Sequence, residues 1–127
     1  MGGYASSQSG GSLRVWRDYF PTSKVVGLDL HEKSVDLGPR VTVVQGDQSS
    51  EADLDRAVEE LGGPPDLVVD DGSHYHGHAI ASFDCLFPLM PAGSIYVVED
   101  IHTSYWENWG GSLEPTEGTA VGMARGL

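Results

Sequence analysis

The sequence predicts an α/β fold with a mostly parallel, doubly wound sheet, and three observations point to this class. Four short runs rich in β-branched residues alternate with segments of helical periodicity along the 127 residues. The runs are almost continuously apolar, which is typical of strands covered on both faces. Strand–helix–strand alternation joins neighbouring strands in parallel through right-handed crossovers. We therefore expect strands at residues 24–30, 41–45, 66–70 and 94–99.

The segments between these strands carry apolar residues at helical spacing. Residues 12–20 place Leu13 and Phe20 on one face of an expected helix. Residues 50–61 begin at a serine and are followed by a glycine pair, which are common helix start and stop signals. Residues 77–90 form the third expected helix.

Charge and cysteine content exclude several functional classes. The chain has 19 Asp and Glu against 7 Lys and Arg, a formal charge of −12, whereas a nucleic-acid-binding surface needs clustered basic residues. No apolar run approaches the about 18 residues of a membrane span, and no secretory signal pattern is present. A single cysteine, Cys85, cannot form an internal disulfide, which is typical of a reducing compartment. We expect a cytoplasmic protein with no nucleic-acid and no membrane partner.

Polar residues follow the first two expected strands, at the sheet edge where open parallel sheets bind ligands. Asp29 stands where a nucleoside-binding fold places the acceptor for ribose hydroxyls, and a solvated strand-end acid is the alternative. Asp47 and Gln48 are candidates either for an adenine contact or for the cap of the following helix. A nicotinamide-dependent oxidoreductase is disfavoured because the glycine fingerprint is incomplete, and no P-loop lysine or nucleophilic serine elbow is present.

Pairs of adjacent acids follow the last two expected strands, as Asp70-Asp71 and Glu99-Asp100. Neighbouring carboxylates repel each other, and a bound cation removes that repulsion. Adjacent strands would bring Asp71, Glu99 and Asp100 towards one spot. Oxygen ligands of this kind suit Mg²⁺ or Mn²⁺ rather than zinc. The alternative is a set of unrelated, solvated acids.

Three histidines lie close behind the first acid pair. His74 is three residues after Asp71, and an imidazole beside a metal-bound hydroxyl is a suitable general base near neutral pH. His76 and His78 fit a structural or substrate-facing role better than a zinc site, because neither the spacing nor any cysteine completes a tetrahedral ligand set. The aromatic residues within 105–109 fit a substrate wall, buried packing or a partner surface.

The order of these segments resembles a known enzyme family. In the segments GGSLRVWRDYFP, GLDL, GDQS, LVVDDGSH, SFDCLFPLMPAGSIYVVEDIHTSYW and WGG, in this order, the chain resembles a family of sugar O-methyltransferases. These enzymes depend on S-adenosylmethionine and a metal ion and act in macrolide and other polyketide antibiotic tailoring. The resemblance covers roughly residues 2–111, and DDGSH followed by VVED-x-x-TSYW is its most specific part. It implies the class I methyltransferase sheet, a Rossmann-like fold.

The resemblance also implies roles by position. The magnesium ligands, for which Mn²⁺ is an alternative ion, match Asp71, Glu99 and Asp100. The catalytic base matches His74. The positions around S-adenosylmethionine match Gly2, Gly3, Asp29, Asp47, Gln48 and Asp70. The implied reaction is methyl transfer from the sulfonium to a sugar hydroxyl of a glycosylated natural product, with Mg²⁺ chelating two neighbouring hydroxyls.

The chain departs from the family pattern at both ends. In the family a strand ending in a Glu-x-Gly-type motif comes before the glycine loop, at the sheet centre between the strands that end here at Asp29 and Asp70. Closing strands are expected after Leu127. We therefore expect a fragment that lacks the first and the C-terminal strands. Residues 1–111 would be a partial catalytic domain, and residues 112–127 a truncated tail that is disordered or the start of a further element.

Two functional interpretations follow for this chain. The first is a methyltransferase core with a small glycoside as substrate, and the sequence leaves homo-oligomerisation open. The second is a non-catalytic remnant of the fold that serves as a binding or assembly module, in which the acids are vestigial. A saturable Mg²⁺ site distinguishes them, because only the first interpretation requires one.

Overall fold

The computed structural model describes residues 10–127, so Gly2 and Gly3 of the expected cofactor loop lie outside the described residues. Short 3₁₀ helices occur at η2 (Phe87–Leu89), η3 (Ile101–Tyr105) and η4 (Glu107–Trp109). The longer elements are, in chain order, α1 (Gly11–Tyr19), β1 (Val25–Asp29), β2 (Val41–Gln45), α2 (Glu51–Leu61), β3 (Leu67–Asp70), α3 (His76–Leu86), β4 (Ile95–Val98) and α4 (Ala120–Arg125). No helix within residues 10–127 is both long enough and apolar enough to cross a membrane.

The expected strands and helices are confirmed, with small shifts at their ends. All four strands lie within one residue of the expected bounds, and α1 and α2 do so as well. The third helix differs, because its regular part ends at Leu86 and continues only as a 3₁₀ turn. Pro88 lies in that turn, and a proline has no backbone N–H to continue an α-helix.

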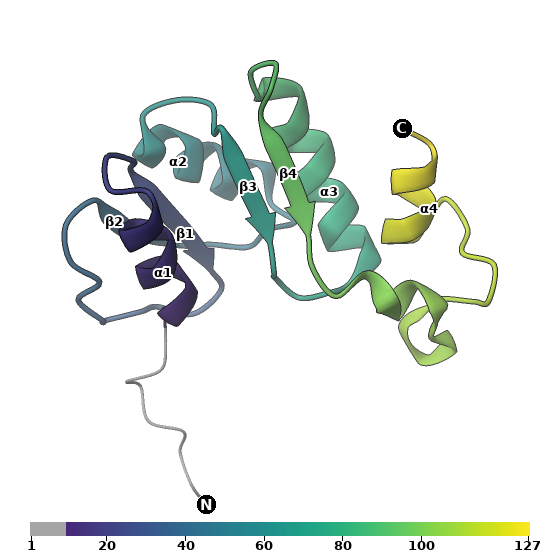
Figure 1. Ribbon diagram of the computed structural model, residues 1–127. Coiled ribbons are helices and arrows are strands. Elements are labelled where there is room, and N and C mark those ends of the chain that lie inside the picture. The colour runs from purple at the N-terminus through teal and green to yellow at the C-terminus, as the bar shows by residue number, and fades with distance from the viewer. Residues whose placement is uncertain (1–9) are drawn as a thin grey trace, which may run out of the picture.

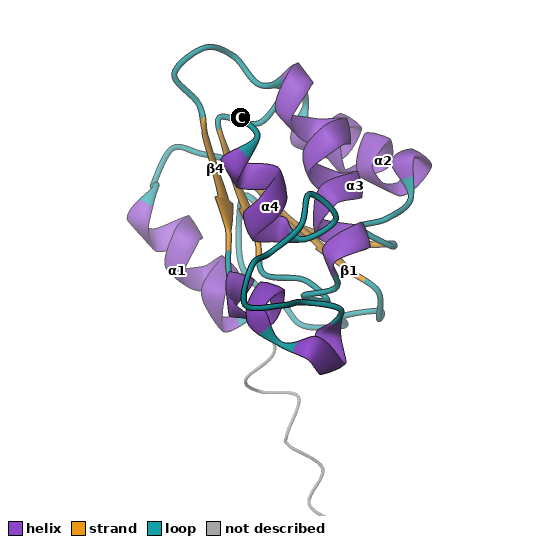
Figure 2. Cartoon of the chain, turned by 90° about the vertical axis from the view of Figure 1, so that its right-hand side faces the viewer, coloured by secondary structure: helices purple, strands orange, loops and turns teal. Residues whose placement is uncertain are grey.

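The strands lie in a middle layer between helices. Figure 2 shows the strands between α1 on one side and α2 with α3 on the other. Strands β1 and β2 pair in parallel, and so do β3 and β4. The two pairs form separate two-stranded sheets with no ladder between β1 and β3 in the described part of the chain (Figure 1). That unpaired position is where the resemblance predicts an additional strand.

The register of β3 and β4 places their carboxyl ends side by side. Leu67 pairs with Ile95 and Asp70 with Val98. One further backbone hydrogen bond follows, from the Glu99 N–H to the Asp70 carbonyl at 2.9 Å. The residues immediately after both strands therefore start at the same sheet edge.

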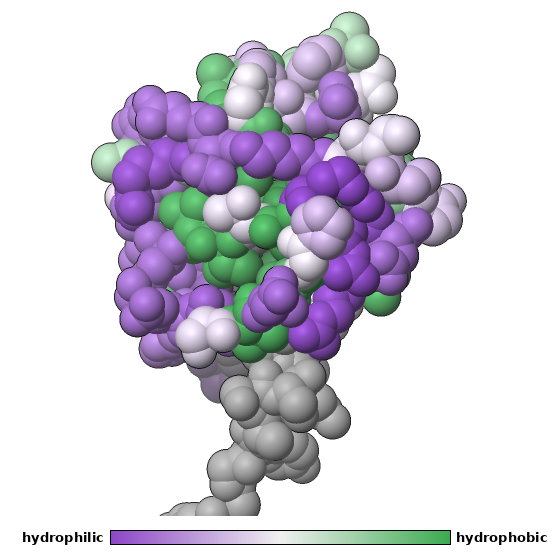
Figure 3. Space-filling view, turned by 90° about the vertical axis from the view of Figure 1, so that its left-hand side faces the viewer, coloured by the Kyte–Doolittle hydropathy of each residue, from purple (hydrophilic) through white to green (hydrophobic). Residues whose placement is uncertain are grey.

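The core is small, and the strands are less covered than the sequence predicts. Leu54 on α2 is 3% exposed, and Phe83 on α3 packs against Phe87 and Tyr96 at centroid distances of 4.6 Å and 5.1 Å. Burial raises the pKa of the Tyr96 hydroxyl to about 12. All residues of β1 and β3 are only half-buried, and Ile95 on β4 is exposed. Figure 3 likewise shows apolar residues ringed by polar ones on the left-hand face of Figure 1.

The last segment contains a helix that the sequence did not predict. Thr119 is the N-cap of helix α4, and its hydroxyl accepts a hydrogen bond from the Gly122 N–H at 3.1 Å. The fully buried Ser104 accepts a second hydrogen bond from the Val121 N–H, at 3.2 Å. A Cβ atom on Gly122 would lie 1.7 Å from the Thr116 carbonyl oxygen, so only glycine fits there. Six residues are too few for a helical period to be visible, which explains the missed element.

We expect Ser104→Ala to loosen this C-terminal segment. The change leaves the buried Val121 N–H without an acceptor, which costs about 1–3 kcal/mol in the free energy of unfolding. Urea denaturation monitored by circular dichroism measures this change in the free energy of unfolding. Ser23→Ala is the matched control, because Ser23 is exposed. Equal stability of the two variants would contradict this account of the segment.

Candidate functional site

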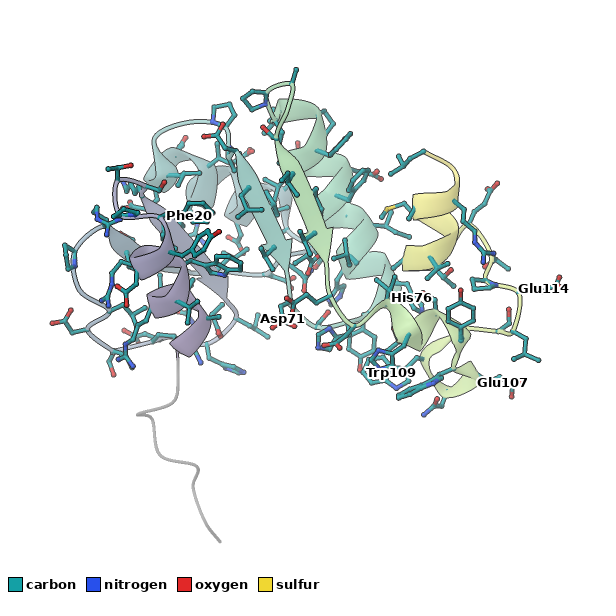
Figure 4. The ribbon with its side chains drawn as sticks, in the orientation of Figure 1. Phe20, Asp71, His76, Glu107, Trp109 and Glu114 are labelled. Carbon is teal, nitrogen blue, oxygen red and sulfur yellow. The ribbon has the colours of Figure 1, made fainter. Side chains whose placement is uncertain are left out.

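Three of the predicted residues converge at the carboxyl ends of β3 and β4. Asp71, His74 and Asp100 each offer a ligand atom, and these atoms all lie within 4.8 Å of one another. Asp71 directly follows β3, and Asp100 is the second residue after β4. Figure 4 shows Asp71 just beyond the end of β3. The parallel register therefore produces a small cluster of oxygen and nitrogen donors at one sheet edge.

Both His74 and Asp100 have a backbone conformation that residues other than glycine rarely adopt. Their φ angles are 61° and 56°, in the left-handed region. Such residues cost about 1–3 kcal/mol each and persist only where the surrounding structure holds them. The buried Thr103 hydroxyl lies 3.5 Å from the His74 carbonyl oxygen and 3.4 Å from that of Asp100. The His74 Nε2 atom lies 3.5 Å from Oδ2 of Asp100.

Glu99 is next to the cluster and is perturbed by it. The negative charge of Asp71 is the main reason why the pKa of Glu99 lies above its ordinary value, followed by desolvation, a hydrogen bond with Asp71 and the charge of Asp100. His74 opposes the shift. Glu99 is not among the residues whose ligand atoms lie within 4.8 Å of one another, but its carboxylate contributes to the same crowding of negative charge.

Sequence reasoning did not single out His102. Its Nδ1 atom lies 3.8 Å from Oδ1 of Asp100, on the other carboxylate oxygen from His74. Its ring meets that of Trp106 edge-on at a centroid distance of 4.6 Å. The signal available in the sequence was its position two residues after the second acid pair.

The predicted cofactor residues Asp29 and Asp47 lie at or just after the carboxyl ends of β1 and β2 and have protein partners. Asp29 accepts a hydrogen bond from the His31 N–H at 2.9 Å and lies 3.4 Å from the Lys33 ammonium. Asp47 accepts hydrogen bonds from the hydroxyl and the N–H of Ser49, at 2.6 Å and 2.7 Å. These bonds hold the pKa of Asp47 below its ordinary value. The N-cap of α2 is Ser50, whose hydroxyl accepts a hydrogen bond from the Asp53 N–H, so neither Asp47 nor Gln48 caps this helix.

Gln48 and Asp70 form a hydrogen-bonded pair beneath the loop that carries Asp71 and His74. The Gln48 Nε2 atom donates to both carboxylate oxygens of Asp70, at 3.1 Å and 3.2 Å. The Ser82 hydroxyl donates to Asp70 at 2.9 Å. Asp70 and Asp71 therefore diverge: Asp70 bonds to protein groups, and Asp71 is exposed.

The other histidines and the aromatic residues border the cluster. The Nδ1 atom of His78 lies 2.8 Å from the Ser73 hydroxyl, and His76 is buried with no partner at either ring nitrogen. These observations concern the described residues, and a structural or substrate-facing role for the two histidines stays a prediction. The exposed Tyr75 packs on Trp109 at a centroid distance of 5.3 Å. A substrate wall at these rings stays a prediction.

Parallel strands lie between two helical layers, and the chain matches a solved methyltransferase structure over 98% of its length. The fold is therefore part of a class I methyltransferase fold, as the resemblance predicts. No family model matches the chain. The chain is similar to mycinamicin VI 2''-O-methyltransferase of Micromonospora griseorubida, with 42% identity over all of this chain and 32% of that protein. A tetracenomycin rhamnosyl 2'-O-methyltransferase of Streptomyces olivaceus is 43% identical over all of this chain and 34% of its own length.

Solved structures agree with the sequence comparison. The MycE methyltransferase of the mycinamycin pathway, in complex with Mg, S-adenosylhomocysteine and mycinamycin VI, matches with a TM-score of 0.85 and 43% identity. The match covers 98% of this chain and 33% of that one. The resemblance to sugar O-methyltransferases of antibiotic pathways is therefore confirmed, and the chain spans about a third of the length of these relatives.

The crowding of Asp71 and Glu99 predicts how Glu99 titrates. We expect Asp71→Asn to bring the pKa of Glu99 back towards its ordinary value of 4.5, because the largest cause of its elevation is removed. In the unmodified chain, the Glu99 contribution to the unfolding free energy falls as pH rises from 4.5 through the raised pKa, since the folded state binds the proton more tightly. Carboxyl-carbon NMR titration measures the pKa directly. Asp84→Asn, on the exposed side of α3, should leave it unchanged.

Proposed function

We propose that this chain carries the metal and base groups of an S-adenosylmethionine-dependent O-methyltransferase that acts on a sugar hydroxyl of a glycosylated natural product. The observation that carries the proposal is the convergence of Asp71, His74 and Asp100 within 4.8 Å at the sheet edge. The names of the similar proteins support it, since they are O-methyltransferases of antibiotic glycosides.

The donor set suits a hard divalent cation. Asp71 and Asp100 supply carboxylate oxygens within the cluster, and Glu99 adds a third carboxylate beside Asp71. The elevated pKa of Glu99 reflects repulsion that a bound cation would relieve. We assign Asp71, Glu99 and Asp100 to hold Mg²⁺, or Mn²⁺ in its place. When bound, the ion lowers the pKa of a coordinated sugar hydroxyl.

We assign the role of catalytic base to His74. Its Nε2 atom faces the carboxylates, 3.5 Å from Oδ2 of Asp100, and can take the proton of an acceptor hydroxyl held in the cluster. Asp100 then lies close enough to stabilise the resulting imidazolium. The acceptor oxygen forms its bond to the methyl carbon as the carbon–sulfur bond breaks, leaving S-adenosylhomocysteine and a proton on His74.

The methyl donor would occupy the edge next to the metal site. We assign the cofactor region to the residues predicted for it, which are Gly2, Gly3, Asp29, Asp47, Gln48 and Asp70. Asp29 supports the ribose assignment because it is at the carboxyl end of β1 and remains partly exposed. Its Oδ2 atom lies 3.4 Å from the Lys33 ammonium and its Oδ1 atom accepts from the His31 N–H, so a ribose would share these oxygens with protein donors.

Partners and location follow the sequence expectations. We propose a small glycoside as substrate, a cytoplasmic location on the basis of the single cysteine, and no nucleic-acid partner because of the −12 charge. Homo-oligomerisation stays open. A binding or assembly module, in which the acids have no catalytic role, is the second candidate function.

Two substitutions separate the metal role from the base role. We expect Asp100→Asn to weaken Mn²⁺ binding at least about tenfold, because a charged ligand is lost. His74→Ala should keep the Mn²⁺ affinity within about threefold and lower methyl transfer by about 10²–10⁴-fold. Electron paramagnetic resonance measures free Mn²⁺, and transfer of a radiolabelled methyl group to a glycoside measures activity.

The outcomes distinguish the candidate functions. Asp84→Asn is the control for a lost surface carboxylate and should change neither measurement. An equal loss of Mn²⁺ affinity in His74→Ala and Asp100→Asn would make His74 a ligand rather than the base. A folded chain without any saturable Mn²⁺ site would contradict the methyltransferase proposal and favour the binding module.

A further inference from the structure

The carboxamide of Gln48 connects two loops that are distant in sequence. Gln48 lies three residues after β2, and its Nε2 atom donates to both oxygens of Asp70 at the end of β3. Its Oε1 atom accepts a hydrogen bond from the Ser73 backbone N–H at 2.8 Å. Both polar ends of this side chain are thus bonded to the segment that leads into the metal and base residues.

The hydrogen bond to Ser73 fixes the backbone between two residues of the proposed site. Ser73 is between Asp71 and His74, and its hydroxyl also lies 2.8 Å from Nδ1 of His78. The backbone and the side chain of Ser73 are therefore both held. The next residue, His74, has the left-handed φ of 61°, a conformation that persists only where the surrounding structure enforces it. A fixed Ser73 is one such constraint.

The absence of a side chain at Gly72 leaves room for the Gln48 carboxamide. A Cβ atom at this position would lie 1.9 Å from Oε1 and 2.7 Å from Cδ of Gln48. The Gln48 carboxamide occupies the space that a side chain would need. Any larger residue at position 72 must therefore push the carboxamide out of its hydrogen bonds with Asp70 and Ser73.

We propose that Gln48 is a positioning residue, which holds the Gly72–His74 loop so that Asp71 and His74 face the same point. The role rests on the proposed function, because it concerns the metal and base groups of that site. It also refines the assignment of Gln48 to the cofactor region: both ends of its carboxamide bond to this segment, so Gln48 acts there by supporting the loop and not by a hydrogen bond to adenine.

The proposal predicts a specific effect on metal binding. Residues that orient metal ligands without touching the ion typically contribute about 10–100-fold to affinity or activity. We expect Gln48→Met, which keeps the volume and removes both hydrogen-bonding ends, to weaken Mn²⁺ binding by about that factor. Amide hydrogen exchange of residues 72–75, measured in the full-length chain without metal, should become faster.

A matched glutamine provides the control. Gln45 ends β2 on the exposed side, and its Nε2 atom donates only to the Leu30 carbonyl, at 3.3 Å. Gln45→Met therefore removes a glutamine of the same neighbourhood without touching the Gly72–His74 loop. Its Mn²⁺ affinity and its loop exchange rates should equal those of the unmodified chain, and urea denaturation should show that both variants fold.

A double-mutant cycle tests the mechanism independently of any general loss of stability. Gly72→Ala should reproduce the effect of Gln48→Met, because the new Cβ displaces the carboxamide. In a Gln48→Ala background the collision is absent, so Gly72→Ala should add less than about twofold to the loss of affinity. Strong non-additivity of this kind is the mark of two residues that act through one contact.

The results separate this inference from the proposed function. Faster exchange and weaker Mn²⁺ binding in Gln48→Met, with a non-additive cycle, support the positioning role. Unchanged exchange at residues 72–75, or full additivity of the two changes, overturns it even where Mn²⁺ binds. Absence of Mn²⁺ binding in the unmodified chain overturns the proposed function and the positioning role in it, and the exchange measurement then reports only whether Gln48 restrains the loop.

Discussion

The parallel pairing of β3 with β4 is the interaction on which the candidate site depends. The hydrogen bond from the Glu99 N–H to the Asp70 carbonyl, at 2.9 Å, extends the ladder by one step beyond the strands. Because of this hydrogen bond, the residues that follow β3 and β4 start level with each other at the same edge of the sheet. A shift of one residue in this register would turn the side chains to the opposite face and separate the acids.

The site combines electrostatic repulsion with backbone strain. The pKa of Glu99 is raised mainly by Asp71, and left-handed backbone at His74 and Asp100 adds a conformational cost. Such costs persist only where packing and hydrogen bonds impose the geometry. Here the buried Thr103 hydroxyl and the Gln48 carboxamide are the nearby groups that do so. Both costs are thus concentrated at one sheet edge, where we propose the cation site.

The sequence predicted the local elements well and the tertiary details less well. Each of the four strands was placed within one residue, because continuous apolar runs are a strong signal. Helix α4 was missed because six residues show no period, and the half-buried state of β1 and β3 was missed because a run of apolar residues does not reveal how many of its faces have partners. The roles of Asp29, Asp47 and the metal ligands remain predictions.

By itself, the sequence determined the fold class and the chemical character of the site: alternating strands and helices, paired acids after two strands, and a histidine three residues on. Tertiary structure decided which of these groups meet. Asp70 and Asp71 are adjacent in sequence and diverge in space, since one bonds to Gln48 and Ser82 while the other joins His74 and Asp100. The physical reason is that composition and spacing set the available donors, whereas register and backbone conformation set their directions.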